Sequence, residues 1–161
     1  MGTTPVIVID VATQALTLTD AGGAARRYPV STSRYGAGER EGSYQTPRGR
    51  HQIRARIGAG CPPGTVFVGR RPTGEIWSEA LAAAYPDRDW ILTRILWLSG
   101  LEPGVNRLGN VDTMRRYIYI HGMPDTELCG EPGSIGCIRM RNDDIIELFD
   151  RVEVGTVVDI R

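Results

Sequence analysis

The chain of 161 residues has the composition of a globular domain, with 41% hydrophobic and 24% charged residues. Its 19 basic residues balance its 19 acidic residues, which argues against the basic surface of a nucleic-acid-binding protein. No apolar segment approaches the roughly 20 residues of a membrane span. The length fits one domain with one hydrophobic core, covering residues 1–161.

The first apolar run is short, extending only from Val6 to Ile9, and no basic segment precedes it. A secretory signal needs a basic segment and a longer apolar stretch. If Met1 is the native start, we expect a cytoplasmic protein; a chain trimmed of a signal peptide would be periplasmic. The three cysteines, an odd number, leave at least one free thiol, which suits a reducing compartment.

Short strand-forming segments dominate the chain from end to end. The predicted strands span residues 6–10, 14–19, 27–32, 51–57, 65–69, 90–98, 116–121 and 156–160. The turn at residues 20–23 predicts a hairpin between the second and third of these strands, and residues 72–74 predict another turn.

Two short helices complete the predicted elements. Ser78 is a suitable N-cap for a helix over residues 78–85, and Asn142 for a helix over residues 143–152. No alternation of strands with long helices is present, so a parallel α/β fold is not indicated. We expect a mostly-β domain, a β-sandwich or open barrel with short helices.

The segment with the clearest chemistry begins at His121, which ends a predicted strand, and continues to Cys137, which follows a glycine. A free thiol with a pKa near 8.5 is mostly protonated at neutral pH, and a neighbouring imidazole can remove that proton. Gly136 has no Cβ and leaves room for a substrate carbonyl, which backbone N–H groups can then stabilise as an oxyanion.

Only two histidines are available to activate this thiol. His51 lies in an alternating strand between Arg50 and Gln52, and we expect it to face solvent. His121 is the better base, because a strand end holds it rigidly and Gly122 lets the backbone fold back toward its ring.

These residues resemble the L,D-transpeptidase catalytic domain, also called the YkuD domain. The family motif is His-Gly, a loop, and Ser/Thr-His-Gly-Cys followed by Ile-Arg; the chain has His121-Gly122 and residues 134–140, SIGCIRM. Residues 46–49 (TPRG) and 155–158 (GTVV) are similar to two further family elements. The similarity covers nearly the whole chain, and the main departure is Ile135, where the family usually has a second histidine.

The resemblance implies a role for each matching position. Cys137 would be the acylated nucleophile and His121 the general base, with the carbonyl of Gly122 holding the imidazole in its useful tautomer. Gly136 and Cys137 would supply oxyanion N–H groups. Three neighbours are also candidates: Arg139 grips a substrate carboxylate or braces the loop, Ser134 is a turn residue or contacts substrate, and Tyr119 packs on its strand or contacts substrate. No metal or cofactor is implied.

Other readings of the cysteines remain open at this point. Cys137 can be an inert core thiol. Cys129 and Cys137 can form a disulfide, which would silence the nucleophile. Cys61, Cys129, Cys137 and His121 can bind zinc, although structural zinc sites usually contain closely spaced cysteine pairs.

The resemblance implies peptidoglycan stem tetrapeptides as substrates, cleaved between the L-centre of the diamino acid and D-alanine. With water as acceptor the product is a tripeptide, and we expect this L,D-carboxypeptidase activity in cell-wall recycling. With an amine acceptor the enzyme is an L,D-transpeptidase that forms cross-links or exchanges D-amino acids. An inactive module that binds wall peptides is a third hypothesis, supported by Ile135. Acylation by carbapenems is a further implication.

Overall fold

Ten strands in the computed structural model, which describes residues 4–161, join in one mixed sheet. They are β1 (Val6–Asp10), β2 (Ala15–Thr19), β3 (Ala25–Pro29), β4 (Gly49–Ile57), β5 (Thr65–Val68), β6 (Arg71–Ile76), β7 (Ile91–Gly100), β8 (Tyr119–Gly122), β9 (Ile138–Met140) and β10 (Val157–Ile160). The helices are α1 (Glu79–Ala84), α2 (Asn142–Arg151) and a 3-10 turn at Gly109–Val111. The mostly-β class is therefore confirmed.

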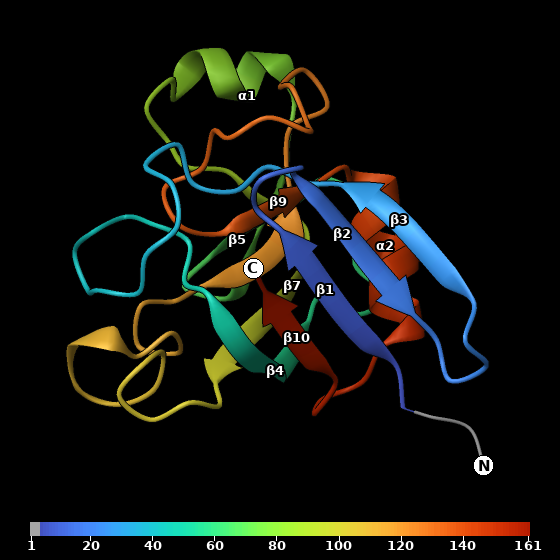
Figure 1. The fold of residues 1–161 in the computed structure, drawn as a ribbon. Coiled ribbons are helices and arrows are strands. Elements are labelled where there is room, and N and C mark those ends of the chain that lie inside the picture. The colour runs from blue at the N-terminus through green and yellow to red at the C-terminus, as the bar shows by residue number, and fades with distance from the viewer. Residues whose placement is uncertain (1–3) are drawn as a thin grey trace.

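The sheet runs in the order β3-β2-β1-β10-β4-β7-β5-β6, and a branch adds β8 beside β7 and β9 beside β8. Two pairs are parallel, β1 with β10 and β8 with β9, and the other pairs are antiparallel. Figure 1 shows β1, β2 and β10 in front of β7, with α2 behind β3. The main hydrophobic core lies between these strands and α2.

The main core draws on nearly every element of the fold. Its buried side chains include Ile7 and Ile9 of β1, Leu16 and Leu18 of β2, Leu96 and Leu98 of β7, Ile120 of β8, Ile138 and Met140 of β9, and Ile145, Leu148 and Phe149 of α2. Burial of this much apolar surface is the main favourable term in folding. The short strands β8 and β9 are thereby fixed from their core side.

All eight predicted strands and both predicted helices are present; β1 has the predicted bounds, and the other elements have shifted ends. The turn predicted at residues 72–74 is wrong, because these residues lie within β6 and the chain reverses at Gly69 and Arg70, both with positive φ. Neither β6 nor the short strand β9 was predicted. Asn142 is not the N-cap of α2: Arg141 is, and the Asn142 amide donates instead to the Met123 carbonyl at 2.9 Å.

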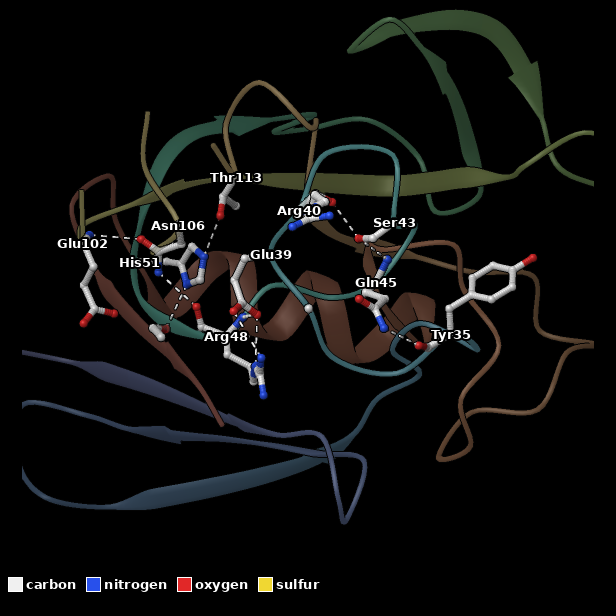
Figure 2. A network of polar contacts seen from close by, with 12 residues as sticks. Tyr35, Glu39, Arg40, Ser43, Gln45, Arg48, His51, Glu102, Asn106 and Thr113 are labelled. Carbon is white, nitrogen blue, oxygen red and sulfur yellow. Dashed lines mark hydrogen bonds and ion pairs between the residues drawn. The ribbon is translucent and has the colours of Figure 1, made fainter. Parts of the chain in front are cut away.

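His51 is fully buried, so the prediction that it faces solvent is wrong. Successive side chains of a strand alternate between faces, and His51 shares its face with the buried Ile53. Figure 2 shows the ring between two partners: Nδ1 lies 2.9 Å from the Gly49 carbonyl and Nε2 lies 2.9 Å from Oγ1 of Thr113. Since a carbonyl only accepts, Nδ1 carries the proton and Nε2 accepts from the threonine hydroxyl.

Asn106 extends this network and ties the loop after β7 to the start of β4 (Figure 2). Its amide donates to the carbonyls of Arg48 and Arg50 at 3.0 and 3.1 Å, and its oxygen accepts from the Glu102 N–H at 3.0 Å. Thr113, held by His51, in turn accepts the N–H of Ile118 just before β8. The network therefore positions the chain that leads into β8.

The burial of His51 predicts acid sensitivity of the fold. Burial lowers the pKa of His51 from 6.5 to about 4, so the folded protein holds the neutral ring. This contribution to stability is present above pH 6.5 and is lost as the pH falls toward 4, because the unfolded chain takes up the proton first. The free energy of unfolding, measured by chemical denaturation, should fall between pH 7 and pH 4 in both proteins. The fall should be smaller in His51→Gln than in the parent, by about 3 kcal/mol. Equal losses in both proteins would contradict a neutral buried His51.

Candidate active site

The parallel pairing of β8 with β9 brings the histidine and the cysteine to one face of the sheet. Ile120 pairs with Ile138, and His121 pairs with Arg139. Because side chains alternate along each strand, Cys137 lies on the face of His121, while Ile120 and Ile138 point into the main core. The two predicted catalytic residues are therefore diagonal neighbours on adjacent strands.

His121 is held by its own backbone neighbour. The side chain is buried, and its Nδ1 lies 2.6 Å from the carbonyl oxygen of Gly122. The carbonyl can only accept, so Nδ1 carries the proton and Nε2 is left as the basic atom. This is the contact that the resemblance implied for Gly122.

A side chain at position 122 would not fit. A Cβ there would lie 2.6 Å from the carbonyl oxygen of Leu92 and would also meet the amide of Asn142. The strand beside it, β7, carries a bulge between Leu92 and Ile95, where Thr93 has a positive φ of 74° and its hydroxyl donates to Asn142. The bulge bends β7 next to the histidine, a common device at functional sites.

Cys137 lies immediately before β9, with its sulfur against the backbone of the neighbouring strand. Sγ is 3.4 Å from the N–H of Tyr119 and 3.4 Å from the carbonyl of Tyr117, to which the thiol donates. Within residues 4–161 no hydrogen bond joins Sγ to the imidazole of His121. Catalytic hydrogen bonds are often long before substrate binds, and a thiol rotation is needed here to direct the proton toward the ring.

Burial keeps both groups neutral in the resting protein. It raises the pKa of the Cys137 thiol to about 12, an effect that the Tyr119 N–H opposes, and lowers the pKa of His121 to about 4. Smaller contributions come from Asp89, which raises both pKa values, and from Arg139, which lowers both. The site is therefore a thiol beside a neutral base, and proton transfer must accompany attack on the substrate.

The turn before Cys137 depends on a glycine. Gly136 has a φ of 133°, a backbone conformation that residues with a Cβ rarely adopt, and an added Cβ would lie 3.2 Å from Cδ1 of Ile118. The Gly136 carbonyl accepts from the hydroxyl of Thr46 at 2.9 Å. Thr46 belongs to the Thr-Pro element, which thus anchors the nucleophile's turn.

Ser134 organises the same turn from inside. Its hydroxyl donates to the Cys137 carbonyl at 2.6 Å and accepts from the Gly136 N–H at 3.2 Å. The Gly136 N–H is therefore occupied, whereas the Cys137 N–H makes no hydrogen bond within the described residues. Of the two predicted oxyanion donors, Cys137 is the one ready to act.

A cleft of about 620 Å³ opens over Cys137. Its walls are formed by Glu41, Gly42, Tyr44, Gly69, Arg70, Asp89, Ile91, Arg115, Arg116, Tyr117, Ile118, Tyr119 and Ile135. Ile135 is 41% exposed and faces this space, so the position of the family's second histidine presents an apolar group to a substrate. Tyr119 lines the cleft as well, in keeping with a substrate contact.

Arg139 is already paired. Its guanidinium lies 3.3 Å from Asp89 and 3.7 Å from Glu127, and it does not line the cleft. Asp89 precedes β7 and Glu127 follows β8, so these ion pairs brace two loops against β9. Of the two predicted roles for Arg139, the structure favours bracing.

Two of the alternative interpretations, a disulfide and a zinc site, find no support in residues 4–161. Cys61, Cys129 and Cys137 are all free thiols, so a Cys129–Cys137 disulfide is absent. No group of three or more potential metal ligands gathers in this part of the chain. None of the helices described there is long and apolar enough to cross a bilayer.

Most residues that line the cleft were not singled out from the sequence, and four of them carry polar or charged groups close to the thiol's strand or to its loops. Arg70, Asp89, Arg116 and Tyr117 line the cleft, although they come from three separate loops. Arg116 donates to the carbonyls of Gln45 and Gly38 at 2.6 and 3.3 Å. Of these residues, only Arg116 and Tyr117 could have been found from the sequence, because they come just before β8, the strand that carries His121.

A thiol and a carbonyl-bound imidazole thus lie on adjacent strands beside one cleft, and these are the two groups that cysteine-dependent acyl transfer requires. The sequence model of the L,D-transpeptidase catalytic domain (YkuD) matches residues 4–160, and the chain belongs to this family. A search of curated proteins found no match.

Solved L,D-transpeptidases share the fold. A Mycobacterium smegmatis enzyme is 19% identical with a TM-score of 0.57, over 98% of this chain and 58% of that one. An L,D-transpeptidase from Xylanimonas cellulosilytica is 18% identical with a TM-score of 0.59, and the match covers 100% of this chain and 62% of that one. L,D-transpeptidase 3 from Mycobacterium tuberculosis, in complex with a faropenem-derived adduct, is 16% identical with a TM-score of 0.60, over 98% and 60%. The chain thus spans about six-tenths of the length of these proteins.

The neutral resting state predicts how the thiol responds to pH. The rate of Cys137 alkylation by iodoacetamide, followed by mass spectrometry of the modified peptide, should be low at pH 7 and should rise about tenfold per pH unit beyond pH 9. The physical reason is burial, which raises the thiol pKa to about 12. A rate that is high and constant between pH 5 and 8 would instead demonstrate a preformed thiolate–imidazolium pair.

Proposed function

We propose that the protein is a cysteine L,D-carboxypeptidase acting on peptidoglycan stem tetrapeptides. Cys137 attacks the carbonyl of the diamino acid's L-centre, and water completes the release of a tripeptide and D-alanine. The observation that carries this proposal is the hydrogen bond of His121 Nδ1 to the Gly122 carbonyl, with Cys137 on the same face and open to a cleft. Family membership supports the substrate class. The cytoplasmic location expected from the sequence belongs to the same proposal.

The residues on this face account for each step of acylation. The thiol sulfur forms a bond to the substrate carbonyl carbon while its proton passes to Nε2 of His121. The resulting oxyanion accepts the N–H of Cys137. The C–N bond then breaks, and D-alanine leaves with the proton returned from His121, so that a thioester remains on Cys137.

Deacylation by water mirrors the first half. His121 removes a proton from water, the hydroxide adds to the thioester, and the sulfur leaves with that proton. A cleft of about 620 Å³ accommodates one short peptide, whereas water requires no groove of its own. The absence of an imidazole at Ile135 supports the same choice, because one fewer base is available to deprotonate an ammonium acceptor.

The second candidate function is transpeptidation, in which an amine takes the place of water. The solved structures that share the fold are named L,D-transpeptidases, which favours this alternative. Both functions proceed through the same thioester at Cys137. They differ only in the acceptor.

A defined tetrapeptide distinguishes these outcomes. Incubation with a stem tetrapeptide and D-methionine, followed by mass spectrometry, should yield the tripeptide and free D-alanine. Cys137→Ala should abolish release and His121→Ala should slow it by at least about 100-fold, the usual contribution of a general base. Cys61→Ala is the matched control and should retain activity, since this thiol does not line the cleft.

Other products would identify the other hypotheses. A tetrapeptide ending in D-methionine would establish transpeptidation in place of hydrolysis. A parent protein that binds the tetrapeptide without releasing D-alanine would favour the inactive binding module. Release that persists in Cys137→Ala would contradict the nucleophile.

Acylation by a carbapenem gives an independent test of the thiol. The parent protein should gain the mass of one drug molecule on the peptide containing Cys137, and Cys137→Ser should gain none. The faropenem-derived adduct of the M. tuberculosis enzyme, which has the same fold, supports this expectation. Labelling of Cys61 or Cys129 in place of Cys137 would contradict it.

A further inference from the structure

Arg70 lies at the mouth of the cleft that contains Cys137, in the turn that joins β5 to β6. Its φ of 65° is unusual for a residue with a side chain. The backbone conformation costs free energy, yet it carries a long charged side chain over the cleft, where a glycine would be the least strained choice.

Three aromatic residues hold the Arg70 guanidinium in place. Its carbon lies 4.7 Å from the ring centroid of Trp97 and 5.0 Å from that of Tyr117, and Nη1 donates to the hydroxyl of Tyr119 at 3.1 Å. Trp97 is itself fixed, since its Nε1 donates to the Met114 carbonyl at 3.2 Å. A guanidinium ordered in advance loses little entropy when it binds a ligand.

Within the described part of the chain this guanidinium has no acidic partner. None of the ion pairs among residues 4–161 includes Arg70, whereas the cleft's Asp89 is paired with Arg139. An arginine has five N–H donors in a planar fork, and among residues 4–161 only the contact with Tyr119 uses one of them. Fixed donors and an uncompensated charge suit a planar anion such as a carboxylate.

We propose that Arg70 is a specificity-determining residue that binds a carboxylate of the peptide substrate. The proposal rests on the proposed function, because it assigns the ligand of the same cleft. Tyr119 links the two ends of the site: its N–H contacts the sulfur of Cys137 at 3.4 Å, and its hydroxyl contacts Arg70. The carboxylate recognised by Arg70 therefore lies roughly the length of a tyrosine side chain from the scissile carbonyl, which is about two residues (~7 Å) of extended chain.

Two carboxylates of a stem tetrapeptide lie within this distance of the scissile carbonyl. One is the terminal carboxylate of D-alanine, the leaving group. The other is the side-chain carboxylate of diaminopimelate, which lysine lacks. Both have the chemistry that Arg70 fits, and peptides that lack one or the other distinguish them.

The experiment compares three peptides: the diaminopimelate tetrapeptide, the same peptide with a C-terminal D-alanine amide, and the lysine tetrapeptide. Each is measured for kcat/KM with the parent, Arg70→Gln and Arg71→Gln. The parent should prefer the first peptide over one of the other two by about 10- to 100-fold, the cost of losing a charge-assisted hydrogen bond. Arg70→Gln should lose this preference. Arg71→Gln, the matched control, should keep it, because Arg71 is exposed and does not line the cleft.

Two further measurements distinguish a loss of carboxylate recognition in the Arg70 variants from a loss of folded structure. Arg70→Lys retains the charge without the fork and should retain a reduced preference, and thermal unfolding confirms that each variant is folded. Calorimetric titration of the three peptides into the Cys137→Ala protein, with and without Arg70→Gln, measures the same preference as a ratio of Kd values when no reaction occurs.

The outcomes separate the two proposals. Equal loss of kcat/KM for all three peptides in Arg70→Gln, or no change at all, would overturn the assignment of Arg70 while leaving the proposed function intact. A parent protein that cleaves none of the peptides but binds them with an Arg70-dependent preference would overturn the function and support the assignment. Peptides that neither bind nor react would overturn both.

Discussion

The site depends on the parallel pairing of two very short strands. β8 and β9 pair in a register that sets Ile120 beside Ile138, and a slip of one residue would move Cys137 to the opposite face from His121. Arg139 secures this register from the other edge of β9, because its N–H and carbonyl both bond to Ser31 at 2.9 Å. The apolar residues of the two strands lie in the main core, so the energy that folds the protein also aligns its reactive groups.

Burial has an equally direct consequence for the chemistry. The protein packed around the two groups raises the pKa of the Cys137 thiol and lowers the pKa of the His121 imidazole, so each group is at rest in its neutral form. Many cysteine enzymes instead keep a thiolate paired with a charged histidine. Among the described residues the one hydrogen-bond partner of the ring is the Gly122 carbonyl, and Ile135 contributes no second imidazole. Negative charge therefore has to develop on the substrate oxygen during attack, where the Cys137 N–H is available to donate a hydrogen bond to it.

Local patterns in the sequence predicted most of the strands, both helices and the pair Cys137–His121. His51 shows the kind of error such patterns allow: its polar neighbours suggested an exposed strand, although its alternation with Ile53 placed it on the buried face. β9 was missed because three residues carry too little periodicity. Arg70, Asp89 and Arg116 were missed for a different reason, since only the tertiary fold brings their separate loops to one cleft. The paired state of Arg139 was equally invisible in sequence.

The chemistry of the site requires that the Gly122 carbonyl fix a neutral His121 with its proton on Nδ1, which leaves Nε2 free to take the proton of Cys137. Nitrogen-15 NMR of the histidine side chains in the free protein at pH 7 reports the protonation of each ring nitrogen, with His51→Gln used to assign the two rings. We expect the His121 ring to give the signals of a neutral imidazole, with Nδ1 protonated and Nε2 unprotonated. Signals of an imidazolium, or of the tautomer with its proton on Nε2, would contradict it.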